Sequence, residues 1–159
     1  MPKVVIIMGS KADMEYGKKI TNVLNDFGLN YVIRIASAHK TPLKVLKIIK
    51  DYDSDEVVFI TIAGRSNALS GFVDAQTTNP VIACPPPPSD ACLCVDIFSS
   101  LRMPSGVCPM TVLGAENAAL AAIKILSIKD KRLVSKIKKY QTEMKRKIEQ
   151  ADKEVANNG

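Results

Sequence analysis

The stretch that decides the fold is Val4-Val5-Ile6-Ile7-Met8-Gly9-Ser10, close to the start of the chain. Its first five residues are all apolar, and a short continuous apolar run is typical of a strand buried on both faces. A helical apolar stripe follows over residues 12–26, and Gly28 comes after it as a typical C-terminal cap. The pattern therefore predicts a buried strand, a polar turn and a helix.

The same alternation of strand and helix signals continues along the chain. Thr41-Pro42 predicts a helix start, with Thr41 as the N-cap and Pro42 in the first helical position. The further predicted strands are Tyr31–Ile35, Val57–Ile62, Pro80–Cys84 and a short one at Met110–Leu113. The further predicted helices cover residues 42–52, 90–101, 115–126 and 129–155, and the loop 64–71 opens another. This order predicts an α/β fold: a three-layer αβα, flavodoxin-like parallel sheet with an extra long C-terminal helix.

Length and composition point to one globular domain. The 159 residues are 47% apolar and 24% charged, which is an ordinary balance for a single core. We expect residues 1–128 to form the α/β domain and residues 129–159 to form an amphipathic helix that belongs to the same domain. No apolar run approaches the roughly 20 residues that a membrane span needs, and the first residues lack the pattern of a secretory signal. The sequence therefore favours a cytoplasmic protein with no membrane partner.

The net charge of +6 lies mostly in the last part of the chain. Residues 129–159 hold 10 Lys and Arg against 5 Asp and Glu, whereas residues 1–128 hold 12 against 11. A basic tail is compatible with nucleic-acid binding or with a scaffold role. The charges follow a helical pattern with a single aromatic residue, which favours a solvated helix face, so we expect no nucleic-acid partner. The apolar stripe of this helix, which we predict to be a packing seam, consists of Leu133, Ile137, Tyr140, Met144 and Ile148.

Polar clusters follow the first three predicted strands. They are Gly9–Asp13, Ser37–Lys40 and Ala63–Gly71. Ligands of open parallel sheets bind outside the carboxyl ends of the strands, so these clusters are the candidate binding site.

Several residue types in these clusters suit an anionic ligand. Gly9 lets the backbone approach a ligand, and Ser10 precedes a helix N-terminus, which favours an anion. Asp13 suits ribose hydroxyl groups, or is an ordinary first-turn acid that offsets the helix dipole. His39, the single histidine, lies between Ser37 and Lys40. It suits proton transfer beside a bound anion, or is a loop histidine without a role.

Other kinds of site find no support in the sequence. The Gly-x-Gly-x-x-Gly fingerprint and the Gly-Lys-Ser/Thr phosphate loop are both absent. The pair Cys92-x-Cys94 has no zinc-like spacing and no histidine nearby, and Cys84 fits a buried strand position. We therefore expect no dinucleotide or triphosphate ligand, no metal and no disulfide scaffold.

At the polar clusters the sequence resembles the PurE family, the 5-aminoimidazole ribonucleotide (AIR) carboxylases of purine biosynthesis. The matching motifs, spread over most of residues 3–126, are Ile7-Met8-Gly9-Ser10-x-x-Asp13, Arg34-x-x-Ser37-Ala38-His39-Lys40-x-Pro42, Ala63-Gly64-Arg65-Ser66-Asn67, Pro80-Val81-Ile82 and Met103-Pro104-Ser105-Gly106-Val107. The resemblance implies an enzyme without a cofactor. It also implies a homo-oligomer, a tetramer or an octamer, and the apolar character of helix 115–126 agrees with burial at a subunit contact.

The family has two branches, and the sequence resembles the one that uses free carbon dioxide. Lys40, the Ala63–Asn67 loop, the lack of a second histidine and the stretch 99–106 are similar to that branch. Residues 68–71, Ala-Leu-Ser-Gly, depart from it, because the branch often has more glycine there. The alternatives are the branch that rearranges N-carboxyaminoimidazole ribonucleotide, a mutase, and a non-catalytic module that binds a nucleoside monophosphate.

The resemblance implies a role for each candidate residue. His39 would be the catalytic base that removes a proton from the carboxylated ring. Ser10, Ser37 and Lys40 would bind the phosphate, and Asp13 the ribose. The loop 64–71 would cover the ring, with Ser66 and Asn67 on the carboxylate. The remaining residues expected to line the substrate are Gly9, Ala38, Gly64, Ala68 and Gly71.

Overall fold

The computed structural model describes residues 3–54, 56–88 and 94–157. The strands are β1 (Val4–Met8), β2 (Tyr31–Ile35), β3 (Val58–Ile62), β4 (Val81–Ala83) and β5 (Met110–Thr111). The α-helices are α1 (Met14–Asp26), α2 (Pro42–Tyr52), α3 (Ala68–Asp74), α4 (Phe98–Leu101), α5 (Ala115–Ser127) and α6 (Lys131–Asn157). Two short 3-10 helices, η1 (Lys11–Asp13) and η2 (Cys94–Ile97), precede α1 and α4.

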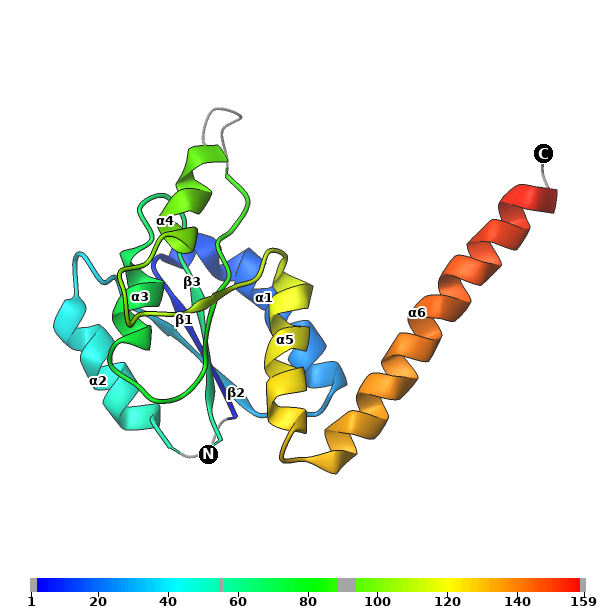
Figure 1. Cartoon of the computed structure of the whole chain (residues 1–159), viewed down its shortest axis with the longest axis horizontal. Coiled ribbons are helices and arrows are strands. Elements are labelled where there is room, and N and C mark those ends of the chain that lie inside the picture. The colour runs from blue at the N-terminus through cyan, green and yellow to red at the C-terminus, as the bar shows by residue number, and fades with distance from the viewer. Residues whose placement is uncertain (1–2, 55, 89–93, 158–159) are drawn as a thin grey trace.

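The sheet is parallel throughout and has the strand order β2-β1-β3-β4-β5. The chain moves outward from β1 to β2 and then crosses back to β3 on the other side of β1. This is the flavodoxin-like order, and its switch point lies between β1 and β3. The predicted fold class is therefore confirmed (Figure 1).

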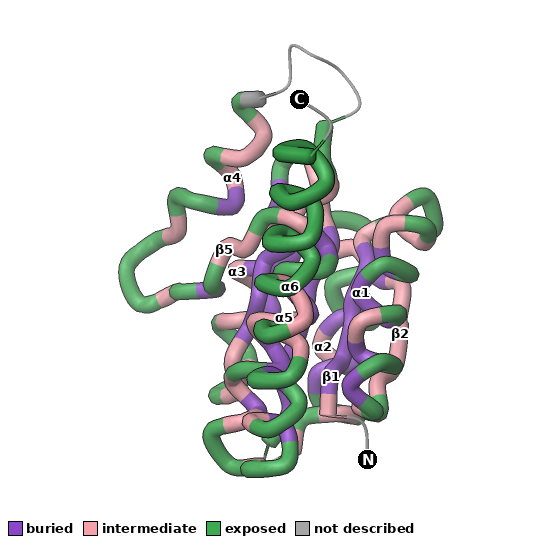
Figure 2. The backbone as a smooth tube through the Cα atoms, turned by 90° about the vertical axis from the view of Figure 1, so that its right-hand side faces the viewer, coloured by how far each residue is buried: buried purple, intermediate pink, exposed green. Residues whose placement is uncertain are grey.

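Helices cover both faces of the sheet, because alternate strand residues point to opposite sides. Val4, Ile6 and Met8 of β1 face one core together with α1, α5 and the start of α6. Val5 and Ile7 face the second core together with α2 and α3. Figure 1 shows these two helix layers on either side of the strands, and Figure 2 shows the buried residues gathered between them.

Helix α5 is apolar because it is enclosed within the subunit. Its buried residues face the sheet and helix α1, and α6 packs against it at one end. Its exposed positions are polar, namely Glu116, Asn117 and Lys124. The apolar character of this helix, which we had connected with a subunit contact, is thus explained inside one chain.

Helix α6 belongs to the body only in its first part. Leu133 and Ile137 are buried, and the Tyr140 ring lies against the Phe27 ring with centroids 5.8 Å apart. Beyond Tyr140 the helix continues away from the sheet, as Figure 1 shows in orange and red. Ile148 of the predicted seam is 73% exposed. The predicted seam therefore packs on its own subunit in its first half only.

Some predicted elements differ from the observed ones. The helix predicted from residue 12 begins with the 3-10 turn η1, and β2 is only partly buried because it is an edge strand. Residues 90–93 of the predicted helix 90–101 lie outside the described residues, and the rest of it forms η2 and α4. Among the described helices, none is both long and apolar enough to cross a membrane.

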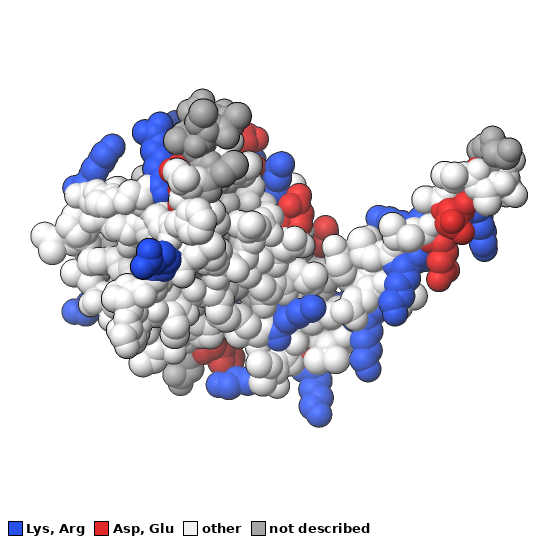
Figure 3. All heavy atoms as spheres, turned by 45° about the horizontal axis from the view of Figure 1, so that its top comes forward, with Lys and Arg blue, Asp and Glu red and all other residues white. Residues whose placement is uncertain are grey.

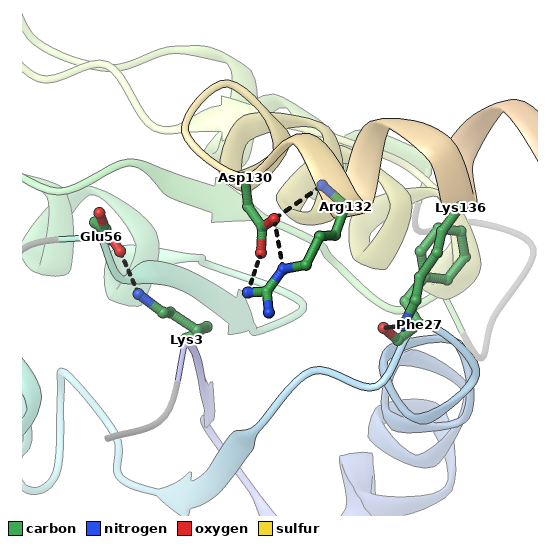
Figure 4. A network of polar contacts seen from close by, with 6 residues as sticks. All are labelled: Lys3, Phe27, Glu56, Asp130, Arg132 and Lys136. Atoms are coloured by element: carbon green, nitrogen blue, oxygen red, sulfur yellow. Dashed lines mark hydrogen bonds and ion pairs between the residues drawn. The ribbon is translucent and has the colours of Figure 1, made fainter.

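At the amino edge of the sheet, where the strands begin, polar contacts lie around the start of α6, and one of them, from Lys136, ties α6 to the body (Figure 4). Asp130 accepts from the backbone and the guanidinium of Arg132, and Lys136 donates to the Phe27 carbonyl oxygen at 2.6 Å. Lys3 pairs with Glu56 beside them. Lys3, Glu56, Asp130 and Arg132 lie around a cavity of about 450 Å³ with a largely apolar lining. On its rim, Lys3 pairs with Glu56, and Asp130 pairs with Arg132. The cavity lies between the start of the sheet and the segment that joins α5 to α6.

Candidate active site

The three predicted polar loops meet at the carboxyl edge of the sheet. Met8 of β1 lies opposite Ile35 of β2 and Ile62 of β3, so the residues after them emerge side by side. Two hydrogen bonds continue the sheet into the loops: Gly9 N donates to the Ile62 carbonyl oxygen (2.9 Å), and Ala36 N donates to that of Met8 (3.0 Å). The structure thus brings the first, second and third loops together at the switch point of the fold.

In the first loop, Ser10 and Asp13 mark the start of the helix. Ser10 caps η1, because its hydroxyl accepts a hydrogen bond from Ala12 N at 3.1 Å. Burial raises the pKa of the Asp13 carboxyl group, and a hydrogen bond from the Ser10 backbone acts in the opposite direction. Gly9 approaches the third loop closely, since a Cβ atom there would lie 3.8 Å from the Ala63 Cβ atom.

The second loop is a tight turn with His39 at its tip. Ser37 Oγ accepts from Lys40 N (3.2 Å), and Thr41 N donates to the Ser37 carbonyl oxygen (2.8 Å). Thr41 takes the predicted N-cap position of α2, but its hydroxyl bonds back to the Ser37 backbone instead of capping the helix. His39 and Lys40 are exposed. The turn therefore presents an imidazole and an ammonium group to solvent at the edge of the site.

The third loop combines an unusual backbone with a buried amide. Arg65 has a φ of 55°, in the left-handed region that non-glycine residues rarely adopt. Asn67 is only 5% exposed, and its side chain turns inward. Its Nδ2 atom donates to Ser70 Oγ (2.7 Å) and to Ser100 Oγ (2.9 Å), while Oδ1 accepts from Ser70 N. Both donor hydrogens of this amide are thus used inside the protein, whereas we had expected it to face the substrate carboxylate.

Two glycines of the third loop region lie against other segments, and at Gly71 the contact leaves little room for a side chain. A Cβ atom at Gly64 would lie 3.5 Å from the Pro86 ring, so the proline run borders this loop. A Cβ atom at Gly71 would lie 2.9 Å from Met103 Sδ, so α3 packs tightly against the segment that begins at Met103. Ala68 is the first residue of α3. Gly71 therefore shapes this side of the site through packing.

The serines that support the third loop were not among the predicted site residues. Ser99 Oγ accepts from Asn67 N (2.9 Å) and lies 2.7 Å from the Arg65 carbonyl oxygen. Ser70 Oγ also lies 2.7 Å from Thr61 Oγ1 in β3. The available signal was the pair Ser99-Ser100 inside an otherwise largely apolar stretch.

Tyr16 and Cys84 meet behind the proline run. Tyr16 OH lies 3.4 Å from the Pro85 carbonyl oxygen and 3.6 Å from Cys84 Sγ. Burial raises the pKa of the Cys84 thiol to about 11. A thiol that stays protonated is a weak nucleophile, so Cys84 is a structural residue, as predicted for a buried strand position.

The edge is basic and offers no metal site among the described residues. Lys11, Lys40 and Arg65 are exposed on its three loops. Figure 3, which brings this edge forward, shows Lys and Arg side chains on this side of the body and along α6. A hydroxyl cap, an exposed imidazole and several cations on three adjacent loops suit a substrate that carries a phosphate group.

Residues 3–147 match the family of AIR carboxylases (AIRC). The chain belongs to this family. It is 61% identical over 153 residues to a phosphoribosylaminoimidazole carboxylase of Archaeoglobus fulgidus, which covers 96% of this chain and 84% of that protein. The crystal structure of Treponema denticola PurE matches with a TM-score of 0.90 and 49% identity, over 95% of this chain and 96% of that one.

The family also contains proteins named for the second reaction. A relative from Methanocaldococcus jannaschii, named N5-carboxyaminoimidazole ribonucleotide mutase, is 41% identical over 96% of both chains. The resemblance to the PurE family is therefore confirmed, and both branches are represented among the relatives. The Archaeoglobus fulgidus carboxylase and the Treponema denticola PurE structure have higher sequence identity to this chain than the Methanocaldococcus jannaschii mutase has.

Proposed function

We propose that this protein carboxylates AIR with free carbon dioxide, giving 4-carboxy-5-aminoimidazole ribonucleotide in purine biosynthesis. The observation that carries the proposal is the meeting of the Ser10 cap, the His39 turn and the Ala63–Asn67 loop at one edge of the sheet. Membership of the AIR carboxylase family and 61% identity to a named carboxylase support it.

The reaction requires a base and no cofactor. The aminoimidazole ring is an enamine, so its nucleophilic carbon attacks carbon dioxide and forms a carbon–carbon bond. That carbon then carries both a hydrogen and a carboxylate. His39 takes the proton, the electron pair of the C–H bond restores the aromatic ring, and the proton leaves to solvent. Exposure of His39 at the tip of its turn gives the imidazole a route to exchange this proton.

The first and second loops bind the parts of the substrate that do not react. Ser10, Ser37 and Lys40 hold the phosphate, and Asp13 accepts hydrogen bonds from the ribose. Gly9 and Ala38 leave room for the backbone to approach the nucleotide. Binding energy from these remote groups fixes the ring beside His39, which lowers the entropy that the chemical step must lose.

The third loop covers the ring and the carboxylate. Gly64 and Ser66 line this part of the pocket, with Ala68 and Gly71 behind them. Because the Asn67 side-chain amide and its backbone N–H are both bonded within the protein, Asn67 contributes by holding the loop. No metal takes part in this scheme, since the ring supplies the electrons and the loop supplies hydrogen-bond donors.

The test is to offer the purified protein two substrates separately and follow the carboxylated product by its absorbance. We expect product from AIR with bicarbonate, at a rate that rises with dissolved carbon dioxide. Product from N-carboxyaminoimidazole ribonucleotide, with none from AIR and bicarbonate, would instead assign the protein to the mutase branch. This branch is the second candidate because some relatives carry the mutase name. Binding of AIR with no product from either substrate would leave a non-catalytic nucleotide-binding module.

We also propose that the protein acts in the cytoplasm as a homo-oligomer, a tetramer or an octamer. The distal half of α6 supports this assembly, because its apolar stripe continues past the body and is exposed there in the part of the chain that the structure describes. Ile148 and Val155, seven residues apart on one helix face, are 73% and 75% exposed. A second copy of the chain would bury this stripe. Light scattering at micromolar concentration tests the assembly.

A further inference from the structure

Ser99 of α4 touches the third loop at two peptide groups that flank a single residue. Its Oγ atom accepts from Asn67 N at 2.9 Å and lies 2.7 Å from the Arg65 carbonyl oxygen, to which it donates. The Arg65 carbonyl and the Ser66 N–H share one peptide plane, and the Ser66 carbonyl and the Asn67 N–H share the next. One hydroxyl group therefore fixes both peptide planes of Ser66.

This contact determines where the Ser66 N–H points. In a trans peptide the carbonyl and the N–H point in opposite directions. Because the Arg65 carbonyl points toward Ser99, the Ser66 N–H points away from α4. Ser66 itself is exposed. The hydroxyl thus turns a backbone donor toward the side of the loop on which the substrate carboxylate would lie.

The third loop needs such support because the backbone conformation of one of its residues, Arg65, is energetically unfavourable. Arg65 holds a φ of 55°, which a residue with a side chain adopts only when its surroundings favour it. The Asn67 amide anchors the far end of the loop to Ser70 and to Ser100, the neighbour of Ser99. Thr111 Oγ1 in turn donates to the Ser100 carbonyl oxygen at 2.9 Å, which ties α4 to β5.

We propose that Ser99 is a positioning residue, which orients the Ser66 N–H to stabilise the carboxylate that forms on the ring. The inference rests on the proposed function, because it assigns this loop to the reacting end of the substrate. Ser99 carries one hydroxyl hydrogen, and the Asp96 carbonyl oxygen, also at 2.7 Å, is the acceptor that a serine in a helix ordinarily uses. The same hydroxyl thus lies within hydrogen-bond distance of a local acceptor on Asp96 and of the Arg65 carbonyl oxygen, and the contact with Arg65 is the one that shapes the loop.

The test compares Ser99→Ala with Thr111→Val. Both changes remove one hydroxyl group from the α4–β5 region, but only Ser99 touches the loop. For Ser99→Ala we expect kcat to fall roughly 10- to 100-fold, the range expected when a backbone donor is displaced. We expect KM for AIR to change less than about threefold, because the other two loops bind the phosphate and the ribose. Ser99→Thr, which keeps the hydroxyl, should recover most of the loss.

A second measurement does not depend on turnover. Hydrogen exchange of the Asn67 amide, followed by NMR in the free protein, should accelerate in Ser99→Ala and stay unchanged in Thr111→Val. If Ser99→Ala does not fold, Ser99→Cys serves the same comparison, because a thiol is a weak donor and a weak acceptor. A wild-type protein that makes no product would overturn the proposed function, while the exchange data would still report on the loop.

Two outcomes would overturn the role of Ser99. One is a Ser99→Ala enzyme with kcat within twofold of the wild type. The other is an equal loss in Thr111→Val, which would indicate a general weakening of α4 instead of a specific effect on Ser66. Unchanged exchange at Asn67 in Ser99→Ala would likewise remove the structural basis of the inference.

Discussion

The two edges of the sheet treat their charged groups differently. At the amino edge, Lys3 pairs with Glu56, and Asp130 pairs with Arg132. At the carboxyl edge, the side chains of Lys40 and Arg65 have no ion-pair partner among residues 3–54, 56–88 and 94–157. The amino edge thus pairs these charged groups within the chain. The carboxyl edge leaves cations and an imidazole exposed, where a ligand can reach them.

The difference extends to the backbone. At the amino edge a lysine, Lys136, satisfies the carbonyl oxygen of Phe27 at the end of α1 and so secures α6. At the carboxyl edge the buried polar groups of Asn67, Ser70 and Ser100 bond to one another and hold a loop whose outer side stays free. Polar groups thus stabilise the fold at one edge and prepare a binding surface at the other.

The largest effect should come from His39, the group on which the proposed chemistry at the carboxyl edge depends. We expect His39→Asn to lower kcat roughly 100- to 10,000-fold, because asparagine cannot accept the proton near neutral pH. AIR should still bind, since the contacts to the phosphate do not involve the imidazole. Steady-state kinetics and calorimetric titration with AIR measure the two effects separately. A variant that keeps more than about a tenth of the activity would show that another group is the base.

The next largest effect should come from the free half of α6, which starts at the amino edge and extends away from it. We expect Ile148→Asp to lower the oligomeric mass, because a charge replaces an apolar side chain in the proposed subunit contact. Lys153→Asp, on the opposite face of the helix, introduces the same side chain and should leave the mass unchanged. Light scattering across a dilution series measures both. A wild-type protein that is monomeric at micromolar concentration would contradict the proposed assembly.

How far the sequence predicts this molecule depends on the kind of interaction. Strand positions followed from local apolar runs, so β1 and β2 begin and end at the predicted residues, and α2 matches its predicted range. The flavodoxin-like order followed from the alternation of elements. The meeting of Gly9, His39 and the third loop at one edge also followed, because all parallel strands point the same way.

Contacts between distant segments were beyond the reach of local patterns. The bond from Asn67 N to Ser99 joins residues 32 positions apart, and no periodicity signals it. The inward turn of the Asn67 amide was missed for the same reason, since its partner Ser100 lies on α4. Helix α6 shows an intermediate case: its stripe was visible in the sequence, but where the stripe leaves the body depends on the position of Phe27.

A smaller effect should come from Asp13, because the charged carboxylate that would bind the ribose is also the form that folding disfavours. Burial raises the pKa of this carboxyl group, so folding favours its protonated form. The stability that this shift contributes is present below the unfolded pKa and is lost as the pH rises through the folded pKa. We therefore expect Asp13→Asn to raise the melting temperature at pH 7, and to raise KM for AIR by about tenfold through loss of a ribose contact.

The matched control for Asp13 is Glu15→Gln, which removes a carboxylate two residues further along, on the exposed side of α1. It should leave KM unchanged. Thermal unfolding at pH 7 and at pH 4 separates the two contributions, because the stabilising effect of Asp13→Asn should shrink at the lower pH. A KM equal to that of the wild type would return Asp13 to the role of a first-turn acid without substrate contact.

The smallest effect should come from the ion pair at the amino edge. Lys3 lowers the pKa of the Glu56 carboxyl group, chiefly through a hydrogen bond. A lowered folded pKa contributes stability that is present above the unfolded pKa, and this stability is lost as the pH falls through the folded pKa. Both side chains are largely solvated, so the contribution is small and screened by salt. We expect Glu56→Gln to lower the melting temperature slightly at pH 7 and low salt, and we expect this difference to disappear as the pH falls through the folded pKa.

Glutamine suits this test because it keeps the length of the side chain and the left-handed backbone of Glu56, whose φ is 70°. Only the charge changes, so any loss of stability reports on the pair with Lys3. Turnover should stay at the wild-type value, because the pair lies at the edge of the sheet opposite to the three loops. A fall in kcat in Glu56→Gln, with the melting temperature unchanged, would contradict the separation of the two edges, since it would mean that a charge at the amino edge acts on the chemistry at the carboxyl edge.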